Sequence, residues 1–180
     1  MSELATLDSI RSAFPALARE HAGFPVAYFD GPGGTQVPRS VADSVSSYLL
    51  RHNANTHWGF PTSAETDRIV TDGRAAAADL LGGNSREIVF GQNMTTLTFQ
   101  LARALGRQFA PETEIVVTQL DHRANVVPWL DMANMWIFSL RSVPFRPSDG
   151  TLDLVVFESV VGERTGLIAF GGAWNALGTV

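Results

Sequence analysis

Residues 114–130 read EIVVTQLDHRANVVPWL, and this stretch decides the fold. Its first part, 114–118, is an apolar run of strand length, and 124–134 continue with the spacing of a helix. The polar residues 120–125 stand between the two, where the strand ends and the helix begins. A strand that leads through a polar loop into a helix is the repeating unit of an α/β fold, and ligands bind such folds at the carboxyl ends of the strands.

The same alternation extends to both sides of this stretch. Strands and helices alternate from Gly83 onward. This pattern predicts an α/β fold with a mostly parallel sheet, helices on both of its faces and right-handed crossovers. The predicted strands are 88–90, 114–118, 136–145 and 167–171, and the predicted helices are 97–106, 124–134 and 152–161.

Upstream of Gly83 the sequence predicts helices separated by irregular segments. Glycine and proline between residues 31 and 35 exclude regular structure there. The predicted helices are a short one through Leu4, Leu7 and Ile10 that Pro15 ends, one from Pro38 to near His52, and one that opens with a Thr62–Glu65 capping box and stops at Gly82–Gly83.

Composition excludes several classes of function. All 13 lysine-or-arginine positions are arginines, there is no cysteine, and the net charge is −5. Disulfides, thiolate metal sites and cysteine nucleophiles are therefore absent, and nucleic acid is disfavoured as a partner. His52 and His57 do not share a helix face and have no evident carboxylate partner, so we expect no metal site. No stretch has membrane-spanning length and no signal peptide is evident, so we expect no membrane partner and a cytoplasmic location.

Polar residues follow three of the predicted strands. Residues 93–96, Asn-Met-Thr-Thr, open a helix whose free N–H groups can cradle a phosphate, although taken alone they favour simple helix capping. His122 is either a binding residue or an ordinary surface histidine, and Asn175 either contacts a ligand or satisfies a turn. Together these loops indicate a site more strongly than each does alone. A nucleotide-binding domain is disfavoured because the glycine and lysine motifs of such domains are missing.

At this point five segments resemble the class V aminotransferases, the fold-type-I pyridoxal-phosphate (PLP) group that includes cysteine desulfurases and selenocysteine lyases. The resemblance is strongest to the cysteine desulfurase-like branch. The segments occur in family order and at family spacing: YFDGPGGTQVP (28–38), HNANTHWGFPTS (52–63), FGQNMTT (90–96), LDHRANVVPW (120–129) and NALGT (175–179).

The resemblance implies PLP as cofactor and assigns residues to it. Thr95, with the backbone N–H groups of Met94 and Thr96, would hold the PLP phosphate. His122 would stack on the pyridine ring, and Asn175 would hydrogen-bond the phenolic oxygen of the cofactor.

The resemblance also implies how this chain relates to a whole enzyme. Residues 1–27 would be an N-terminal helical segment, and 28–180 the N-terminal part of an incomplete PLP-binding large domain. Asn55 and His57 would line the substrate side of the pocket. The aspartate at the pyridine nitrogen, the Schiff-base lysine and the small C-terminal domain are expected beyond Val180.

The parent enzyme is expected to act on the α-amine of an amino acid as a homodimer. This chain has no lysine, and an arginine cannot replace the ε-amine on which PLP chemistry depends. We therefore expect it to be inactive by itself. The alternative is a non-catalytic protein of the same fold that binds a cofactor or a partner.

Overall fold

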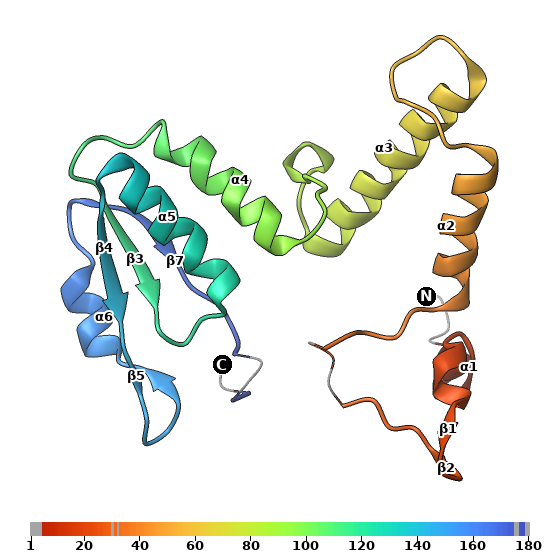
Figure 1. The fold of residues 1–180 in the computed structure, drawn as a ribbon, viewed down its shortest axis with the longest axis horizontal. Coiled ribbons are helices and arrows are strands. Elements are labelled where there is room, and N and C mark those ends of the chain that lie inside the picture. The colour runs from red at the N-terminus through yellow and green to blue at the C-terminus, as the bar shows by residue number, and fades with distance from the viewer. Residues whose placement is uncertain (1–4, 30, 32, 175–176, 179–180) are drawn as a thin grey trace. The chain divides into compact units, whose positions relative to one another are not determined.

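The computed structural model describes residues 5–29, 31, 33–174 and 177–178, and the chain divides into two units, Met1–Val89 and Phe90–Val180 (Figure 1). We describe each unit by itself. No helix in the described ranges is both long and apolar enough to cross a membrane.

A three-stranded parallel sheet forms the centre of the second unit. Its middle strand is β3 (Glu114–Thr118), which pairs on one side with β4 (Ser139–Val143) and on the other with β7 (Thr165–Ala169). All five residues of β3 are buried, as the apolar run in the sequence predicts. Both pairings are parallel, which confirms the predicted α/β class and the parallel sheet.

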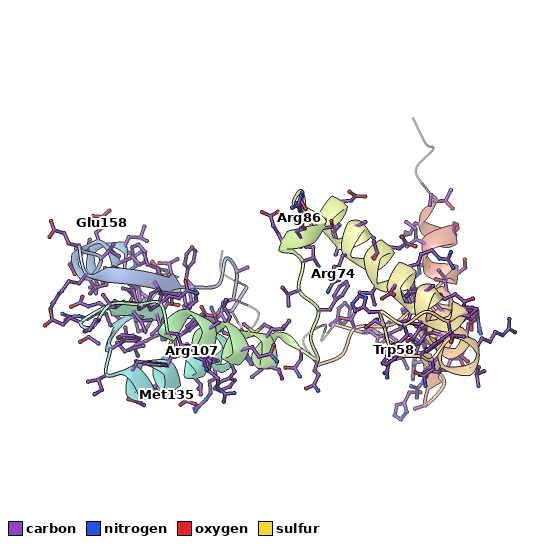
Figure 2. All side chains as sticks on the ribbon, turned by 90° about the horizontal axis from the view of Figure 1, so that it is seen from above. Trp58, Arg74, Arg86, Arg107, Met135 and Glu158 are labelled. Atoms are coloured by element: carbon purple, nitrogen blue, oxygen red, sulfur yellow. The ribbon has the colours of Figure 1, made fainter. Side chains whose placement is uncertain are left out.

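Helices cover both faces of this sheet. They are α4 (Met94–Gly106), α5 (Val127–Trp136) and α6 (Leu154–Val160). In Figure 2, α6 with the labelled Glu158 lies on one side of the strands and α5 with the labelled Met135 on the other. The buried core joins one face of the sheet to α4 and α5, and it consists of Ala102, Ile115, Val117, Trp129, Met132, Ala133 and Ala169.

Short elements complete the second unit. A 3-10 turn, η3 (Arg123–Asn125), connects β3 to α5. An antiparallel hairpin of β5 (Phe145–Arg146) and β6 (Thr151–Leu152) follows β4.

The first unit consists mainly of two long helices, and its three α-helices match predicted helical segments, whereas its two 3-10 turns and its short hairpin were not predicted. Its elements in chain order are α1 (Leu7–Ser12), η1 (Pro15–Ala18), the hairpin β1 (Glu20–His21) and β2 (Phe24–Pro25), α2 (Arg39–Arg51), α3 (Pro61–Leu81) and η2 (Ser85–Glu87). The predicted stop of α3 is confirmed, because Gly82 adopts a left-handed φ of 68° at its end.

The predicted strand over 88–90 is wrong. These residues have no strand assignment, and Val89 and Phe90 are exposed. A strand exists only where a neighbour pairs with its backbone. Within the described residues nothing pairs with this segment, so its apolar side chains do not make a strand.

The predicted strand over 136–145 begins too early. Helix α5 continues to Trp136 and ends at Ile137, whose φ is 60°. The N–H groups of Ile137 and Phe138 both donate to the Ala133 carbonyl, which closes the helix. This helix end could not be predicted from the sequence, because a β-branched residue such as Ile137 rarely adopts a left-handed conformation. The strand therefore starts only at Ser139.

The predicted capping box at the start of α3 is also wrong. Phe60 is the residue before the helix, it makes no side-chain cap, and Pro61 occupies the first turn. Pro61 has no N–H to satisfy and a φ that suits a helix start. Glu65 lies within the helix instead, and its Oε2 is 2.6 Å from Nδ1 of His52.

Candidate functional site

The N-terminus of α4 is the first part of the candidate site. Asn93 caps this helix, and its Oδ1 accepts a hydrogen bond from the Thr96 N–H at 2.9 Å. The N–H groups of Met94 and Thr95 have no acceptor among the described residues. The capping alternative is therefore confirmed, and the phosphate role of this helix start stays a prediction, for which two N–H groups and the exposed Thr95 hydroxyl are available donors.

The loop between β3 and α5 is the second part. His122 is exposed, its Nδ1 accepts from the Ala124 N–H at 3.1 Å, and its own N–H donates to Asp121 Oδ1 at 2.9 Å. The backbone contact on one ring nitrogen fixes the plane of the imidazole. Because the residue is exposed, the ring remains accessible to a flat ligand.

A chain of side-chain hydrogen bonds holds this loop to the core. Asp121 Oδ2 accepts from Asn125 Nδ2 at 3.0 Å, and Asn125 Oδ1 accepts from Trp129 Nε1 at 3.2 Å. Trp129 is buried in the core cluster. The loop that carries His122 is therefore anchored to the interior of the domain. Sequence reasoning gave Asp121 and Asn125 no role, although both stand in the polar segment that follows β3.

The end of β7 reaches the same loop. A Cβ atom added to Gly171 would lie 3.4 Å from Asp121 Oδ1, so the Gly171 backbone lies close to the Asp121 side chain at the carboxyl ends of neighbouring strands. Beyond it, the ring of Trp174 packs on Phe145 with centroids 6.1 Å apart. Asn175, the predicted partner of the phenolic oxygen, lies outside the described residues.

Helices α4 and α5 place these parts at one edge of the domain. Both helices begin at the end of the sheet to which the β3 arrow points (Figure 1), and α4 contacts η3 as well as α5. The start of α4, which carries Met94, Thr95 and Thr96, and the loop before α5, which carries His122, therefore both lie toward this end of the sheet. Helix N-termini at the carboxyl edge of a parallel sheet attract anions.

The predicted substrate residues belong to the other unit. Asn55 is exposed, and His57 adopts a φ of 65° with a largely exposed ring. The His57 N–H donates to both carboxylate oxygens of Asp67, at 3.2 and 3.1 Å, and the Trp58 N–H donates to Ser63 Oγ at 2.8 Å. These bonds fix the loop on the first turns of α3. No group of three or more metal-ligating side chains occurs in the described ranges.

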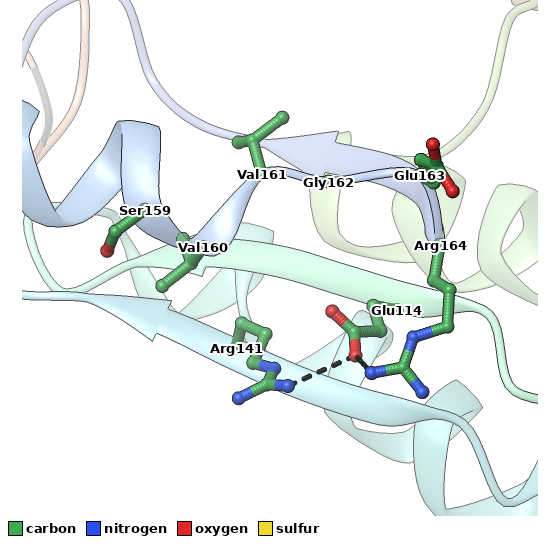
Figure 3. A pocket seen from close by; sticks show the side chains of 8 residues that line it. All are labelled: Glu114, Arg141, Ser159, Val160, Val161, Gly162, Glu163 and Arg164. Carbon is green, nitrogen blue, oxygen red and sulfur yellow. Dashed lines mark hydrogen bonds and ion pairs between the residues drawn. The ribbon is translucent and has the colours of Figure 1, made fainter.

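An ion cluster of one buried carboxylate and two exposed arginines lies toward the opposite edge of the sheet, and the sequence did not predict it. The Glu114 side chain is 8% exposed, and its Oε1 is 3.1 Å from Arg141 Nη2 and 2.6 Å from Arg164 Nη2. Figure 3 shows the two guanidinium groups on either side of this carboxylate, at the floor of a pocket of about 440 Å³. The available signal was a charged residue at the start of an apolar strand.

The cluster changes the titration of Glu114. The hydrogen bond from Arg141 holds the pKa of the Glu114 carboxyl below its ordinary value of 4.5, burial opposes this effect, and the charges of Arg141 and Arg164 add to the lowering. The cluster links the first residue of β3, the middle residue of β4 and the residue before β7, so it connects the three strands of the sheet.

The chain is similar in sequence to one protein family along most of its length. The family model described as "Aminotransferase class-V" matches residues 27–180. The cysteine desulfurase of Serratia proteamaculans is 36% identical over 177 residues, which cover 97% of this chain and 43% of that protein. A probable cysteine desulfurase of Streptomyces coelicolor is 36% identical over 180 residues, with 96% and 43% covered. The chain thus spans less than half the length of these curated relatives.

Solved structures agree with this match. The apo structure of a cysteine desulfurase from Thermococcus onnurineus NA1 has a TM-score of 0.84 and 27% identity, and the match covers 99% of this chain and 43% of that one. A C-DES mutant with glycine covalently linked to its PLP cofactor has a TM-score of 0.72 at 18% identity, which supports the fold alone.

Proposed function

Because the chain belongs to the class V aminotransferase family, we propose that it is the N-terminal part of a PLP-dependent enzyme of the cysteine desulfurase type, acting on the α-amine of an amino acid. The single observation that carries this proposal is the edge at which α4 and α5 begin. There the N–H groups of Met94 and Thr95 lack an acceptor among the described residues, and the loop that follows β3 carries the exposed His122.

We propose that the N-terminus of α4 binds the cofactor phosphate. The Thr95 hydroxyl and the N–H groups of Met94 and Thr95 supply donors at the positive end of the helix dipole. The Thr96 N–H, which the family resemblance also assigns to the phosphate, donates to Asn93 Oδ1. The Thr96 N–H is therefore occupied in this structure, and it can bind the phosphate only if the hydrogen bond to Asn93 is broken.

We propose that His122 orients the pyridine ring by stacking. The contact of its Nδ1 with the Ala124 N–H favours one orientation of the imidazole, in which the ring can meet a flat cofactor. The hydrogen bond between Asp121 and Asn125 supports the loop that carries His122. PLP, when bound, supplies an electron sink for negative charge that develops on the substrate.

The remaining assignments rest on the sequence. We propose that Asn175 hydrogen-bonds the phenolic oxygen and that Asn55 and His57 contact substrate. We also propose that 1–27 form a helical segment that precedes a PLP-binding large domain starting at residue 28, and that the parent enzyme is a homodimer.

The composition favours a second candidate function. No lysine is present in the 180 residues, so the ε-amine that PLP enzymes require must come from elsewhere. We therefore propose that the chain by itself is inactive. A non-catalytic protein that binds the cofactor or a partner is the alternative, and the lack of lysine is the observation in its favour.

Titration of PLP into the full 180-residue chain tests the proposal. We expect saturable binding, followed by cofactor absorbance and tryptophan quenching. Thr95→Val removes a hydroxyl while it preserves side-chain shape, and it should weaken binding by about tenfold, the value of one hydrogen bond to a charged group. Thr71→Val, on the exposed surface of α3, is the matched control and should bind like the unaltered chain.

Two results would contradict the proposal. One is equal PLP affinity for Thr95→Val and the unaltered chain, and the other is tight NAD or ATP binding that PLP does not compete. Borohydride reduction with peptide mapping tests the proposed inactivity of the chain by itself. Because the 180 residues contain no lysine, the α-amine of Met1 is their only primary amine, and we expect reduced cofactor there alone. Reduced cofactor on an internal residue would contradict this expectation.

A further inference from the structure

The pairing of β3 with β7 contains an irregularity close to the Glu114 cluster. Glu114 pairs with Thr165, but Ile115 pairs with Leu167 rather than with the next residue along β7. Gly166 is therefore the extra residue of a β-bulge. From Leu167 to Ala169 the ladder is regular again, and its register is the one that the bulge sets.

Close packing explains why residue 166 is a glycine. A Cβ atom at this position would lie 2.6 Å from Thr113 Cγ2. Thr113 cannot turn away freely, because it is buried and its Oγ1 donates to the Ala110 carbonyl at 2.7 Å. The requirement is steric, since the φ of Gly166 lies outside the left-handed region.

Two contacts hold the bulge in position. The Glu114 N–H donates to the Arg164 carbonyl at 2.8 Å, and Arg164 Nη2 lies 2.6 Å from Glu114 Oε1. Backbone and side chain of the same pair thus fix the residues just before Gly166. In the turn that precedes β7, the Gly162 N–H donates to Thr165 Oγ1 at 2.9 Å.

The register that the bulge sets determines which side chains of β7 face the core and where the residues after β7 lie. In the observed register, Leu167 packs against the core and Ala169 is buried in it, while Ile168 points to the opposite face. A slip by one residue would exchange these faces and move the chain by about 3.3 Å. It would also separate Gly171 from Asp121, whose carboxylate holds the His122 loop.

We propose that Gly166, held by Glu114 and Arg164, is a positioning residue that sets where the segment after β7 meets the Asp121–His122 loop. The inference rests on the proposed function only in calling that loop part of a PLP site. It assigns a functional consequence to an ion cluster and a glycine at the edge of the sheet remote from His122.

The test compares four forms of the full chain: unaltered, Gly166→Ala, Gly166→Ala with Thr113→Ser, and the control Gly162→Ala. Thr113→Ser deletes the methyl group that the new Cβ would strike and retains the hydroxyl bonded to Ala110. An added Cβ at Gly162 meets nothing within 4 Å. Two measurements are made on each form, cross-strand NMR contacts between β3 and β7 and the PLP dissociation constant.

We expect Gly166→Ala to lose the Ile115–Leu167 and Val117–Ala169 contacts and to bind PLP about tenfold more weakly. The double variant should recover both properties, and Gly162→Ala should retain both. If Gly166→Ala does not fold, the double variant still tests the steric argument, because it must fold with the native pairing.

Unchanged cross-strand contacts and unchanged PLP affinity in Gly166→Ala, with only a lower melting temperature, would overturn the inference. Failure of Thr113→Ser to restore the contacts would overturn its steric basis. If the unaltered chain binds no PLP while Gly166→Ala still changes the pairing, the proposed function fails and the positioning role of Gly166 stands.

Discussion

His122 Nδ1 accepts a hydrogen bond from the Ala124 N–H at 3.1 Å, so one residue both caps the turn η3 and presents an aromatic ring at the carboxyl edge of the sheet. A neutral imidazole that accepts at Nδ1 carries its proton on Nε2. The observed capping by His122 and its proposed ring packing can be separated by substitution.

His122→Asn should separate them in one direction. Asparagine is a good cap, so the free energy of unfolding should change by less than about 0.5 kcal/mol. The stacking surface is lost, and PLP should bind several-fold more weakly, since an aromatic contact contributes about 0.5–1.5 kcal/mol. His122→Phe is the converse variant: it should retain PLP and lose about 1 kcal/mol of stability. Equal affinities for both variants would contradict the stacking role.

Asn93→Ala should destabilise the start of α4. The Thr96 N–H loses its acceptor, and a lost N-cap costs about 1 kcal/mol. Urea unfolding followed by circular dichroism measures the change. Asn93→Ser retains a capping oxygen and should differ from the unaltered chain by only a few tenths of that value. If both variants unfold alike, Asn93 is not an important cap.

The Glu114 cluster should make stability depend on pH in the acid range. The pKa of this carboxyl is lower in the folded chain than its ordinary value of 4.5. Its contribution is therefore fully present above 4.5 and is lost as the pH falls through the lowered value. The difference in unfolding free energy between the unaltered chain and Glu114→Gln should shrink over that range.

Glu163→Gln is the control for this experiment. Glu163 borders the same pocket but makes no ion pair in the described part of the chain. Its pH profile should follow that of the unaltered chain. A Glu114→Gln profile parallel to the unaltered one would show that the cluster does not couple to folding.

Ser63→Ala should destabilise the first unit. Ser63 is fully buried, and its Oγ accepts from the Trp58 N–H. Removing the hydroxyl leaves that N–H without its partner, at a cost of about 1–3 kcal/mol. Ser44→Ala is the matched control, since the Ser44 hydroxyl is exposed and contacts only the Ser40 carbonyl. Thermal melting of both variants decides the matter: equal shifts would refute the prediction.

The elements that depend on residues close together in the chain can be predicted from the sequence. The buried strand β3, the glycine stop of α3 and the start of α2 after Pro38 all depend on neighbours in the chain. Residues 88–90 have a strand composition, yet pairing depends on a distant partner. Ile137 closes a helix in a conformation that its side chain disfavours, and no local rule anticipates it.

The candidate site divides in the same way. The capping role of Asn93 and the position of His122 after β3 follow from residue type and order. The hydrogen bond of Asp121 to Asn125 and the bulge at Gly166 depend on how separate segments meet. Sequence periodicity carries no information about such contacts, so they came only from the structure.

The order of strands in the sheet has a kinetic consequence. Strand β3 pairs with β4 and with β7, which both follow it in the chain. The segment between β3 and β7 is about twice as long as the segment between β3 and β4. Each doubling of loop length adds about 0.6 kcal/mol to the entropy of closure. Because the pairing of β3 with β4 closes the shorter loop, we predict that it forms first and that β7 joins last. Contacts of Arg164 that form late would contribute little to the transition state, so their loss should speed unfolding and leave the folding rate nearly unchanged.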